Sequence, residues 1–170
     1  GLVMKFNNPD FGHGVLRELK DEAAGCANVF FLARVMPRDE LNALVTLADC
    51  FVSLHRSEGF GLGPAEAMYL GKPAIITNWS GNIDYMTEEN CAAIDYELVK
   101  LGRDHGPYLA HQHWAEPDTS HAAYWMRKLF ENPDLAAAMG RRGQETIRTQ
   151  HSPRQVGELI KHRLELIRRQ

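Results

Sequence analysis

Two glutamates and three glycines gather in one short stretch, residues 53–68, which reads SLHRSEGFGLGPAEAM. Glu58 precedes the glycines and Glu66 follows them, with seven residues between the two acids. Carboxylates accept hydrogen bonds from the neighbouring hydroxyls of a ribose or another sugar. Glycines let the main chain approach phosphate oxygens, and a helix N-terminus attracts anions. This combination suits a nucleotide joined to a sugar, and a tight strand-to-helix turn is the alternative interpretation of the glycines.

The glycine spacing argues against a nicotinamide-dependent oxidoreductase. Gly59, Gly61 and Gly63 alternate with other residues, and Pro64 stands where the G-x-G-x-x-G fingerprint has its last glycine. That fingerprint also belongs in the first strand unit of its fold, whereas this loop follows the third predicted strand.

The segments around the loop alternate between strand and helix patterns. The predicted strands are Leu2–Phe6, Val29–Ala33, Cys50–Leu54, Pro73–Thr77 and Ala92–Asp95. We expect a turn at residues 7–10 and a helix from Pro64 to about Leu70. Near-continuous apolar strands separated by helices predict an α/β fold, a Rossmann-like doubly wound parallel sheet covered on both faces. The helix after the glycines would then begin at the carboxyl edge of this sheet.

The pattern changes after residue 96. Residues 97–118 contain two glycines, two prolines and three histidines without clear periodicity, so we predict one long loop. Residues 119–170 carry three helical patterns, which predict a helical tail. Trp114–Thr119 marks the start of the first of these helices, with Asp118 or Thr119 as its cap.

Composition limits the class of protein. The chain has 170 residues and a formal net charge of -3. This charge argues against a protein that binds nucleic acid through an excess of Lys and Arg. It contains no apolar run long enough to span a membrane. Its three separated cysteines favour free thiols and a cytoplasmic location. Because the sequence opens inside a predicted strand and without Met, we expect it to be a piece of a longer protein.

Residues 57–77, SEGFGLGPAEAMYLGKPAIIT, resemble the Glu-seven-Glu signature of the retaining group 1 glycosyltransferase family. Residues 31–41, FLARVMPRDEL, are similar to a strand–loop–helix segment of that family. Residues 77–82 lie where the family has a second glycine-bearing turn facing the donor. The likeness covers residues 1–96 well and the helical tail more loosely.

This resemblance implies a GT-B architecture, in which residues 1–170 form the C-terminal, donor-binding domain. An N-terminal acceptor domain and the family's first strand unit would precede Gly1. By the same resemblance, Glu58 would act on the transferred sugar as the catalytic residue, and Glu66 would bind the ribose. The other implied donor-binding residues are Gly59, Phe60, Gly61 and Leu62 for the diphosphate, Arg34 and Val35 for the base, and Ser80 and Gly81 in the second turn.

The implied reaction is transfer of a hexosyl group from a nucleotide-sugar to an acceptor with retention, without cofactor or metal. The acceptor, a saccharide or a lipid-linked group, would bind through the N-terminal domain, as in polysaccharide biosynthesis. The chain alone would then be inactive and would expose surfaces for self-association, and peripheral contact with the inner face of the membrane is a further expectation. The alternatives are a non-catalytic nucleotide-binding module and a sugar-nucleotide epimerase of the same architecture.

Several side chains near the loop allow a functional and a structural interpretation. For Arg56 we favour a surface pair with Glu58 over contact with phosphate, and for His55 we favour packing. Trp79 could stack on a base or sugar, or pack within the fold. Three histidines invite a metal interpretation, which the lack of nearby cysteines or a carboxylate pattern disfavours. They are His105, His111 and His113.

Overall fold

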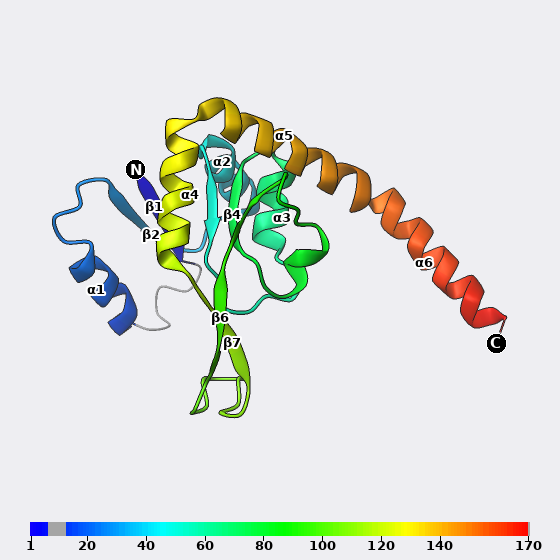
Figure 1. Ribbon diagram of the computed structural model, residues 1–170, viewed down its shortest axis with the longest axis horizontal. Coiled ribbons are helices and arrows are strands. Elements are labelled where there is room, and N and C mark those ends of the chain that lie inside the picture. The colour runs from blue at the N-terminus through cyan, green and yellow to red at the C-terminus, as the bar shows by residue number, and fades with distance from the viewer. Residues whose placement is uncertain (7–12, 170) are drawn as a thin grey trace. The chain divides into compact units, whose positions relative to one another are not determined.

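The computed structural model describes residues 1–6 and 13–169 (Figure 1). Two compact units are present, Gly1–Leu44 and Val45–Gln170, and the division falls within helix α2 (Arg38–Leu47). The turn predicted at residues 7–10 lies outside the described residues.

The first unit is built on a strand–helix–strand motif. Strands β1 (Leu2–Phe6) and β2 (Val29–Ala33) pair in parallel, and helix α1 (His13–Glu22) lies between them in the chain. Parallel neighbours need such a crossover, because a tight turn can only join antiparallel strands. The rings of Phe6 and Phe31 stack with their centroids 6.4 Å apart. Both strands were predicted with these bounds, and the prediction is confirmed.

The second unit contains a three-stranded parallel sheet in the order β3–β4–β5. Helix α3 joins the first two strands, and a short 3-10 helix, η1 (Gly81–Asp84), follows β4. Because the strands are parallel, the loops after all three leave from one edge of the sheet. The elements are β3 (Phe51–Ser53), α3 (Leu62–Tyr69), β4 (Ala74–Thr77) and β5 (Ala92–Ile94).

Strand β4 is buried on both faces. Ile76 belongs to a buried cluster that includes Met68 of α3, whereas its neighbour Ile75 belongs to a second cluster that includes Leu129 of α4 (Thr119–Glu131). Successive side chains of a strand point to opposite faces, so this alternation places a helix layer on each side. Figure 1 shows α3 and α4 on opposite sides of β4. The predicted parallel α/β fold is confirmed, with its strands in two separate hydrogen-bonded sheets instead of one.

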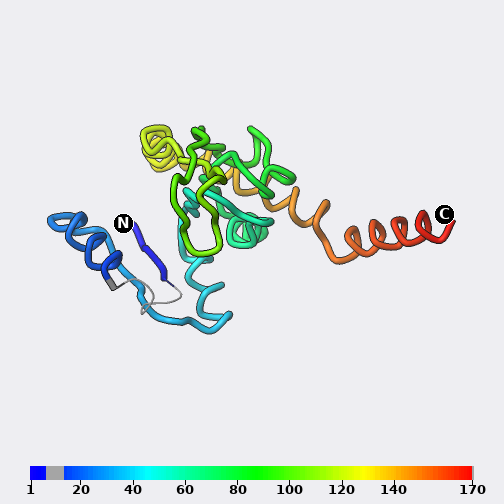
Figure 2. Tube along the Cα trace, turned by 90° about the horizontal axis from the view of Figure 1, so that it is seen from below, coloured from blue at the N-terminus to red at the C-terminus, as the bar shows by residue number. Residues whose placement is uncertain are grey.

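The helical tail is also confirmed, as α4, α5 (Pro133–Gln150) and α6 (Pro153–Arg168). Asp118 caps α4 as expected, because its carboxylate accepts hydrogen bonds from the N–H groups of Ser120 and His121. Helix α6 has no buried residue, and Figure 2 shows it running on from the end of α5. Within residues 1–6 and 13–169, no helix has the length and apolar character needed to cross a bilayer.

The prediction of one long loop at residues 97–118 is wrong. Strands β6 (Tyr96–Lys100) and β7 (His113–Pro117) form an antiparallel hairpin, and only its tip is irregular. The glycines and Pro107 that suggested a loop lie in this tip. Pro117, which cannot donate a ladder hydrogen bond, is the last residue of its strand, a position where proline is tolerated.

Helix α3 begins at Leu62, two residues before the predicted start at Pro64. Gly61 precedes it in the left-handed conformation, with φ 79°, and so turns the chain into the helix. Proline is compatible with the first turn of a helix, because the N–H groups there have no intrahelical acceptor.

We predict that Gly140→Ala destabilises the second unit by roughly 1–3 kcal/mol, the cost of overpacking a close contact. A Cβ at Gly140, in α5, would overlap the carbonyl oxygen of Gly71 at the end of α3 and lie 3.2 Å from Pro73 N. Urea unfolding measures the change. Gly157→Ala in α6 is the matched control, because a Cβ there meets nothing within 4 Å. Equal stability of the two variants would contradict the prediction.

Candidate functional site

The loop after β3 presents its main chain at the carboxyl edge of the sheet. Glu58 is half-buried, whereas Gly59 and Phe60 are exposed. Gly61 is buried, and its carbonyl accepts a hydrogen bond from Ala65 N–H at 3.0 Å in the first turn of α3. An open stretch of main chain therefore leads directly into a helix N-terminus, an arrangement suited to an anion.

The turn after β4 packs against this loop and fixes the main chain of Glu58. A Cβ at Gly81 would overlap the carbonyl group of Gly59 and lie 3.2 Å from the Cα of Phe60, so only glycine allows this approach. The Ser80 hydroxyl donates to the carbonyl oxygen of Glu58 and accepts from Glu58 N–H at 3.3 Å. The structure thus brings together four of the predicted site residues, Glu58, Gly59, Ser80 and Gly81.

Two buried polar side chains, those of Tyr85 and Asn82, hydrogen-bond to main-chain carbonyl groups around the candidate site. Tyr85 donates its hydroxyl hydrogen to the carbonyl oxygen of Gly61 at 2.8 Å, and burial raises the pKa of this phenol, which keeps it protonated. Asn82 donates to the carbonyl oxygen of Thr77 at the end of β4, at 2.9 Å. The sequence analysis missed both residues. For Tyr85 the reason is that its partner lies 24 positions away, and a polar side chain carries no local signal of so distant a contact.

Arg56 pairs with Glu116 of β7, so the predicted pair with Glu58 is wrong. Its Nε and Nη2 lie 2.6 and 2.7 Å from the two carboxylate oxygens of Glu116, and its guanidinium lies 5.0 Å from the centre of the Trp114 ring. Hydrogen bonding to Arg56 lowers the pKa of the Glu116 carboxyl. The hairpin brings this acid to Arg56 from sixty positions along the chain.

His55 and Trp79 both have structural contacts. The His55 ring lies 3.3 Å from the Ser53 hydroxyl and 3.1 Å from the carbonyl oxygen of Trp79, which bears out its structural role. The Trp79 ring packs on Tyr96, the first residue of β6, with centroids 5.2 Å apart. For Trp79 the structure therefore shows a packing contact within the fold.

Glu66 lines an open pocket of about 360 Å³ between α3 and the α5–α6 junction. Its wall is largely apolar, and the Phe60 ring forms part of it, 5.6 Å from the ring of His151. Glu66, the second predicted acid, therefore lies beside a solvent-open cavity. It belongs to α3, the helix that follows the glycine loop. The lining residues are Phe60, Ala65, Glu66, Tyr69, Ile147, His151 and Val156.

The remaining predicted residues, Arg34 and Val35, belong to the first unit. The guanidinium of Arg34 forms an ion pair with Glu40 of α2 at 2.6 Å, and Val35 is exposed. Their predicted contact with a base stays a prediction, and so do the donor contacts of the other predicted residues.

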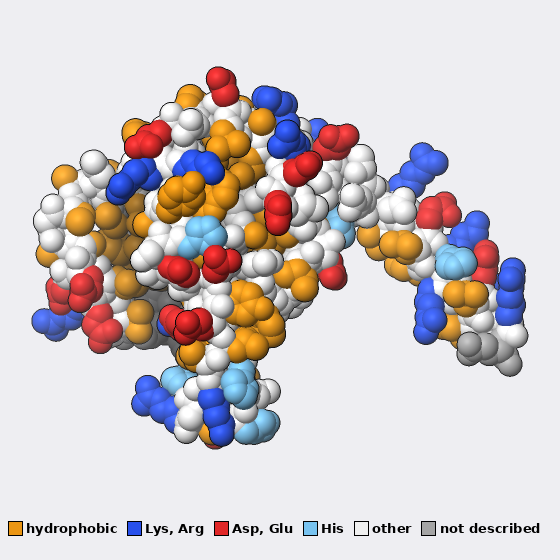
Figure 3. Space-filling view, viewed as in Figure 1, with side chains coloured by type: hydrophobic (Ala, Val, Ile, Leu, Met, Phe, Trp, Pro, Cys, Tyr) orange, Lys and Arg blue, Asp and Glu red, His pale blue; other side chains and the backbone are white. Residues whose placement is uncertain are grey.

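Histidines and basic side chains gather at the tip of the hairpin (Figure 3). Across the described part of the chain, no group of three or more His, Cys, Asp or Glu residues is arranged to hold a metal ion. His105 packs against Trp114, with centroids 5.1 Å apart. All three cysteines are free, and burial raises the pKa of Cys50 and of Cys91 to about 12, so neither is a thiolate near neutral pH.

Residues 14–95 match the family described as Glycosyl transferases group 1. Over this segment the chain is similar to that family. The segment includes both acids, the glycine loop and the turn after β4. The human α-1,3/1,6-mannosyltransferase ALG2 is 25% identical over 132 residues, which cover 78% of this chain and 27% of the human protein. The chain therefore spans about a quarter of that relative's length.

Solved glycosyltransferase structures share the fold. Sucrose-phosphate synthase from Thermosynechococcus elongatus superposes with a TM-score of 0.70 at 19% identity, over 97% of this chain and 39% of its own. The C-terminal domain of the group 1 protein LpcC from Francisella tularensis gives 0.62 at 19% identity, over 86% and 66%. Anabaena HepE in complex with UDP-glucose gives 0.68 at 15% identity, over 94% and 40%. These likenesses confirm the α/β fold with its helical tail.

We predict that Gly81→Ala disrupts the loop that carries Glu58, because the new Cβ would occupy the position of the Gly59 carbonyl group. Hydrogen exchange of the amides in residues 54–61 should accelerate, and stability should fall by roughly 1–3 kcal/mol. Gly59→Ala is the matched control. It changes the other glycine of the same contact, but its new Cβ would meet nothing within 4 Å. Exchange that is the same in both variants would contradict the close packing of the two turns.

We also predict that the Arg56–Glu116 pair loses its effect on stability in acid. Arg56 holds the pKa of Glu116 below its usual 4.5, so the pair contributes above that pH and its contribution disappears as the pH falls through the lowered pKa. Both side chains are half-exposed, so the contribution near neutral pH is about 0–1 kcal/mol. The free energies of unfolding in urea of the unmodified chain and of Glu116→Gln should differ least at the lowest pH. A difference that grows as the pH falls would refute this.

Proposed function

We propose that this chain is the nucleotide-sugar-binding part of an enzyme that transfers a hexosyl group to an acceptor with retention. The observation that carries the proposal is the pair of acids, Glu58 and Glu66, on either side of an exposed glycine loop that ends at a helix N-terminus. The match of residues 14–95 to the group 1 family supports sugar transfer, and the UDP and UDP-glucose complexes of HepE support a nucleotide-sugar as ligand.

The proposed roles are those that the family resemblance implies, and the position of each group supports them. The main-chain N–H groups of residues 59–62, together with the positive end of α3, bind the diphosphate and stabilise the charge that it gains as it leaves. Glu66, on α3 beside the open pocket, accepts hydrogen bonds from the ribose hydroxyls. Glu58, held by the turn after β4, approaches the transferred hexose. The bond from the sugar to the diphosphate breaks, the acceptor hydroxyl oxygen attacks on the same face of the sugar, and the hydroxyl proton passes to the leaving diphosphate oxygen.

Binding of the acceptor is proposed for the whole protein and not for this chain alone. This chain spans 39–40% of the sucrose-phosphate synthase and HepE structures. A saccharide or lipid-linked acceptor, metal-independent chemistry, cytoplasmic location, peripheral membrane contact and self-association all stay predictions. Exposed apolar residues along α6, including Leu159 and Ile160, are compatible with self-association.

A thermal-shift panel of UDP, GDP, UDP-glucose and GDP-mannose tests the proposal on this chain. A ligand that binds only the folded state raises its stability by about 2.7 kcal/mol at a hundredfold excess over the dissociation constant. We expect at least one nucleotide-sugar to raise the midpoint, in EDTA as well as in magnesium. No shift with any of the four ligands, and none by calorimetry, would oppose the proposal.

The two acids should have separable effects. Glu66→Ala should weaken binding of the plain nucleotide by about ten- to a hundredfold, the loss of one charged hydrogen bond. Glu58→Ala should leave the plain nucleotide nearly unaffected and weaken only the nucleotide-sugar. Isothermal titration with both ligands measures the difference, and Glu158→Ala on the exposed face of α6 is the control. An equal loss of nucleotide affinity in both variants would contradict the assigned roles.

A further inference from the structure

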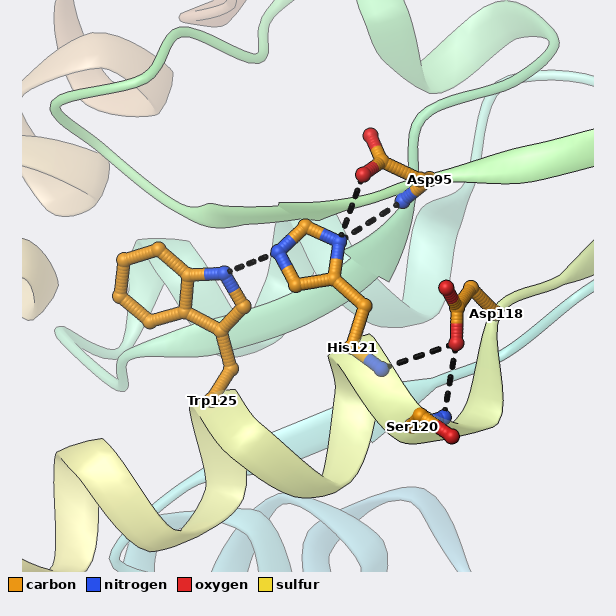
Figure 4. A network of polar contacts seen from close by, with 5 residues as sticks. All are labelled: Asp95, Asp118, Ser120, His121 and Trp125. Carbon is orange, nitrogen blue, oxygen red and sulfur yellow. Dashed lines mark hydrogen bonds and ion pairs between the residues drawn. The ribbon is translucent and has the colours of Figure 1, made fainter.

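The β6–β7 hairpin is anchored at its root to the core of the second unit. Asp118 N–H donates to the carbonyl oxygen of Asp95 at 2.8 Å, which ties together the residue before β6 and the residue after β7. Figure 4 shows how α4 holds both ends: Asp118 caps the helix, and the His121 ring lies 3.0 Å from the Asp95 carboxylate. The Trp125 indole, which can only donate, hydrogen-bonds to the other nitrogen of His121 at 2.9 Å and fixes the ring.

Strand β7 contacts the loop after β3 two residues before Glu58. Ala115 N–H donates to the carbonyl oxygen of Arg56 at 3.0 Å, so the two main chains are joined directly. The Arg56 side chain adds two hydrogen bonds to Glu116 and lies over the ring of Trp114. A planar guanidinium held along one edge by a carboxylate and on one face by a ring has a defined orientation, which a lysine could not reproduce.

Strand β6 contacts the same loop through the turn after β4. The Tyr96 ring packs on Trp79, and the Trp79 carbonyl oxygen lies 3.1 Å from His55 Nε2. The next residue, Ser80, holds the main chain of Glu58 through its hydroxyl. The loop that carries Glu58 is therefore contacted directly by β7, at Arg56, and indirectly by β6, through the turn after β4.

From this arrangement we infer that the β6–β7 hairpin positions the Glu58 loop for its ligand, with Arg56 and Glu116 as positioning residues. The inference rests on the proposed role of Glu58 toward the sugar. An exposed ion pair adds little to folding stability. A small displacement of a group that contacts the reacting sugar can nevertheless reduce its effect by roughly 10²-fold. Loss of the Arg56–Glu116 pair should therefore affect sugar recognition much more than stability or binding of the plain nucleotide.

Glu116→Gln in this chain tests the inference with two independent measurements. Hydrogen exchange of the amides in residues 54–61 should become several-fold faster, while exchange in α5 stays unchanged. Affinities are measured for UDP with UDP-glucose and for GDP with GDP-mannose, and the pair that binds the unmodified chain is used. The preference for the nucleotide-sugar over its nucleotide should fall by about three- to tenfold, with nucleotide affinity unchanged. Asp21→Asn, which removes the acid of the exposed Arg17 pair in the first unit, is the matched control.

The outcomes separate this inference from the proposed function. If the unmodified chain binds a nucleotide-sugar, and Glu116→Gln leaves both exchange in the loop and the preference for the sugar unchanged, the hairpin has no positioning role and the proposed function stands. If the unmodified chain binds neither pair, the proposed function and the role of the hairpin toward a sugar fail together. The exchange measurement then shows only whether the hairpin restrains the loop.

Discussion

The close approach of two turns at the carboxyl edge of the sheet is the contact on which the candidate site depends. The turn after β4 reaches the loop after β3 because Gly81 has no Cβ to separate it from the Gly59 carbonyl group. Ser80, with φ 80°, is the one non-glycine residue with positive φ among the described residues, and such a conformation costs roughly 1–3 kcal/mol. Its hydroxyl contacts the main chain of Glu58, so the unfavourable conformation coincides with the contact that fixes the candidate catalytic loop.

The parallel sheet makes this contact available. Strands β3 and β4 pair directly, so the segments that follow them leave side by side, and β5 adds the root of the hairpin to the same edge. The two buried faces of β4 hold the strands in place, with α3 on one side and α4 on the other. Tyr85 extends this support to the loop after β3, because it donates to the carbonyl oxygen of Gly61, and Asn82 donates to the carbonyl oxygen of Thr77 at the end of β4. The core thus determines where the main chain of the candidate site lies.

Local patterns were sufficient to predict the five parallel strands, the helical tail and the stretch from Glu58 to Glu66, because apolar periodicity and motif spacing are properties of neighbouring residues. Contacts between distant segments could not be predicted in this way. Glycines and prolines in the tip concealed the hairpin, although the strands beside it are regular. Arg56 was assigned to the nearest acid in sequence, Glu58, whereas the fold supplies Glu116. The contact of the Ser80 hydroxyl with the main chain of Glu58 was likewise not predicted, and the donor-binding role predicted for Ser80 stays a prediction.

The two acids of the motif are held in different ways, and this difference has a consequence for how the site can vary. Glu66 lies on α3, whose residues Ala65 and Met68 pack in the core, so its position is set by the most buried part of the fold. Glu58 lies on a loop whose position is set by contacts from the turn after β4 and from the hairpin. Substitutions in those outer segments can move Glu58 while the helix that bears Glu66 stays in place. In the proposed roles, recognition of the sugar can therefore change while binding of the nucleotide is preserved.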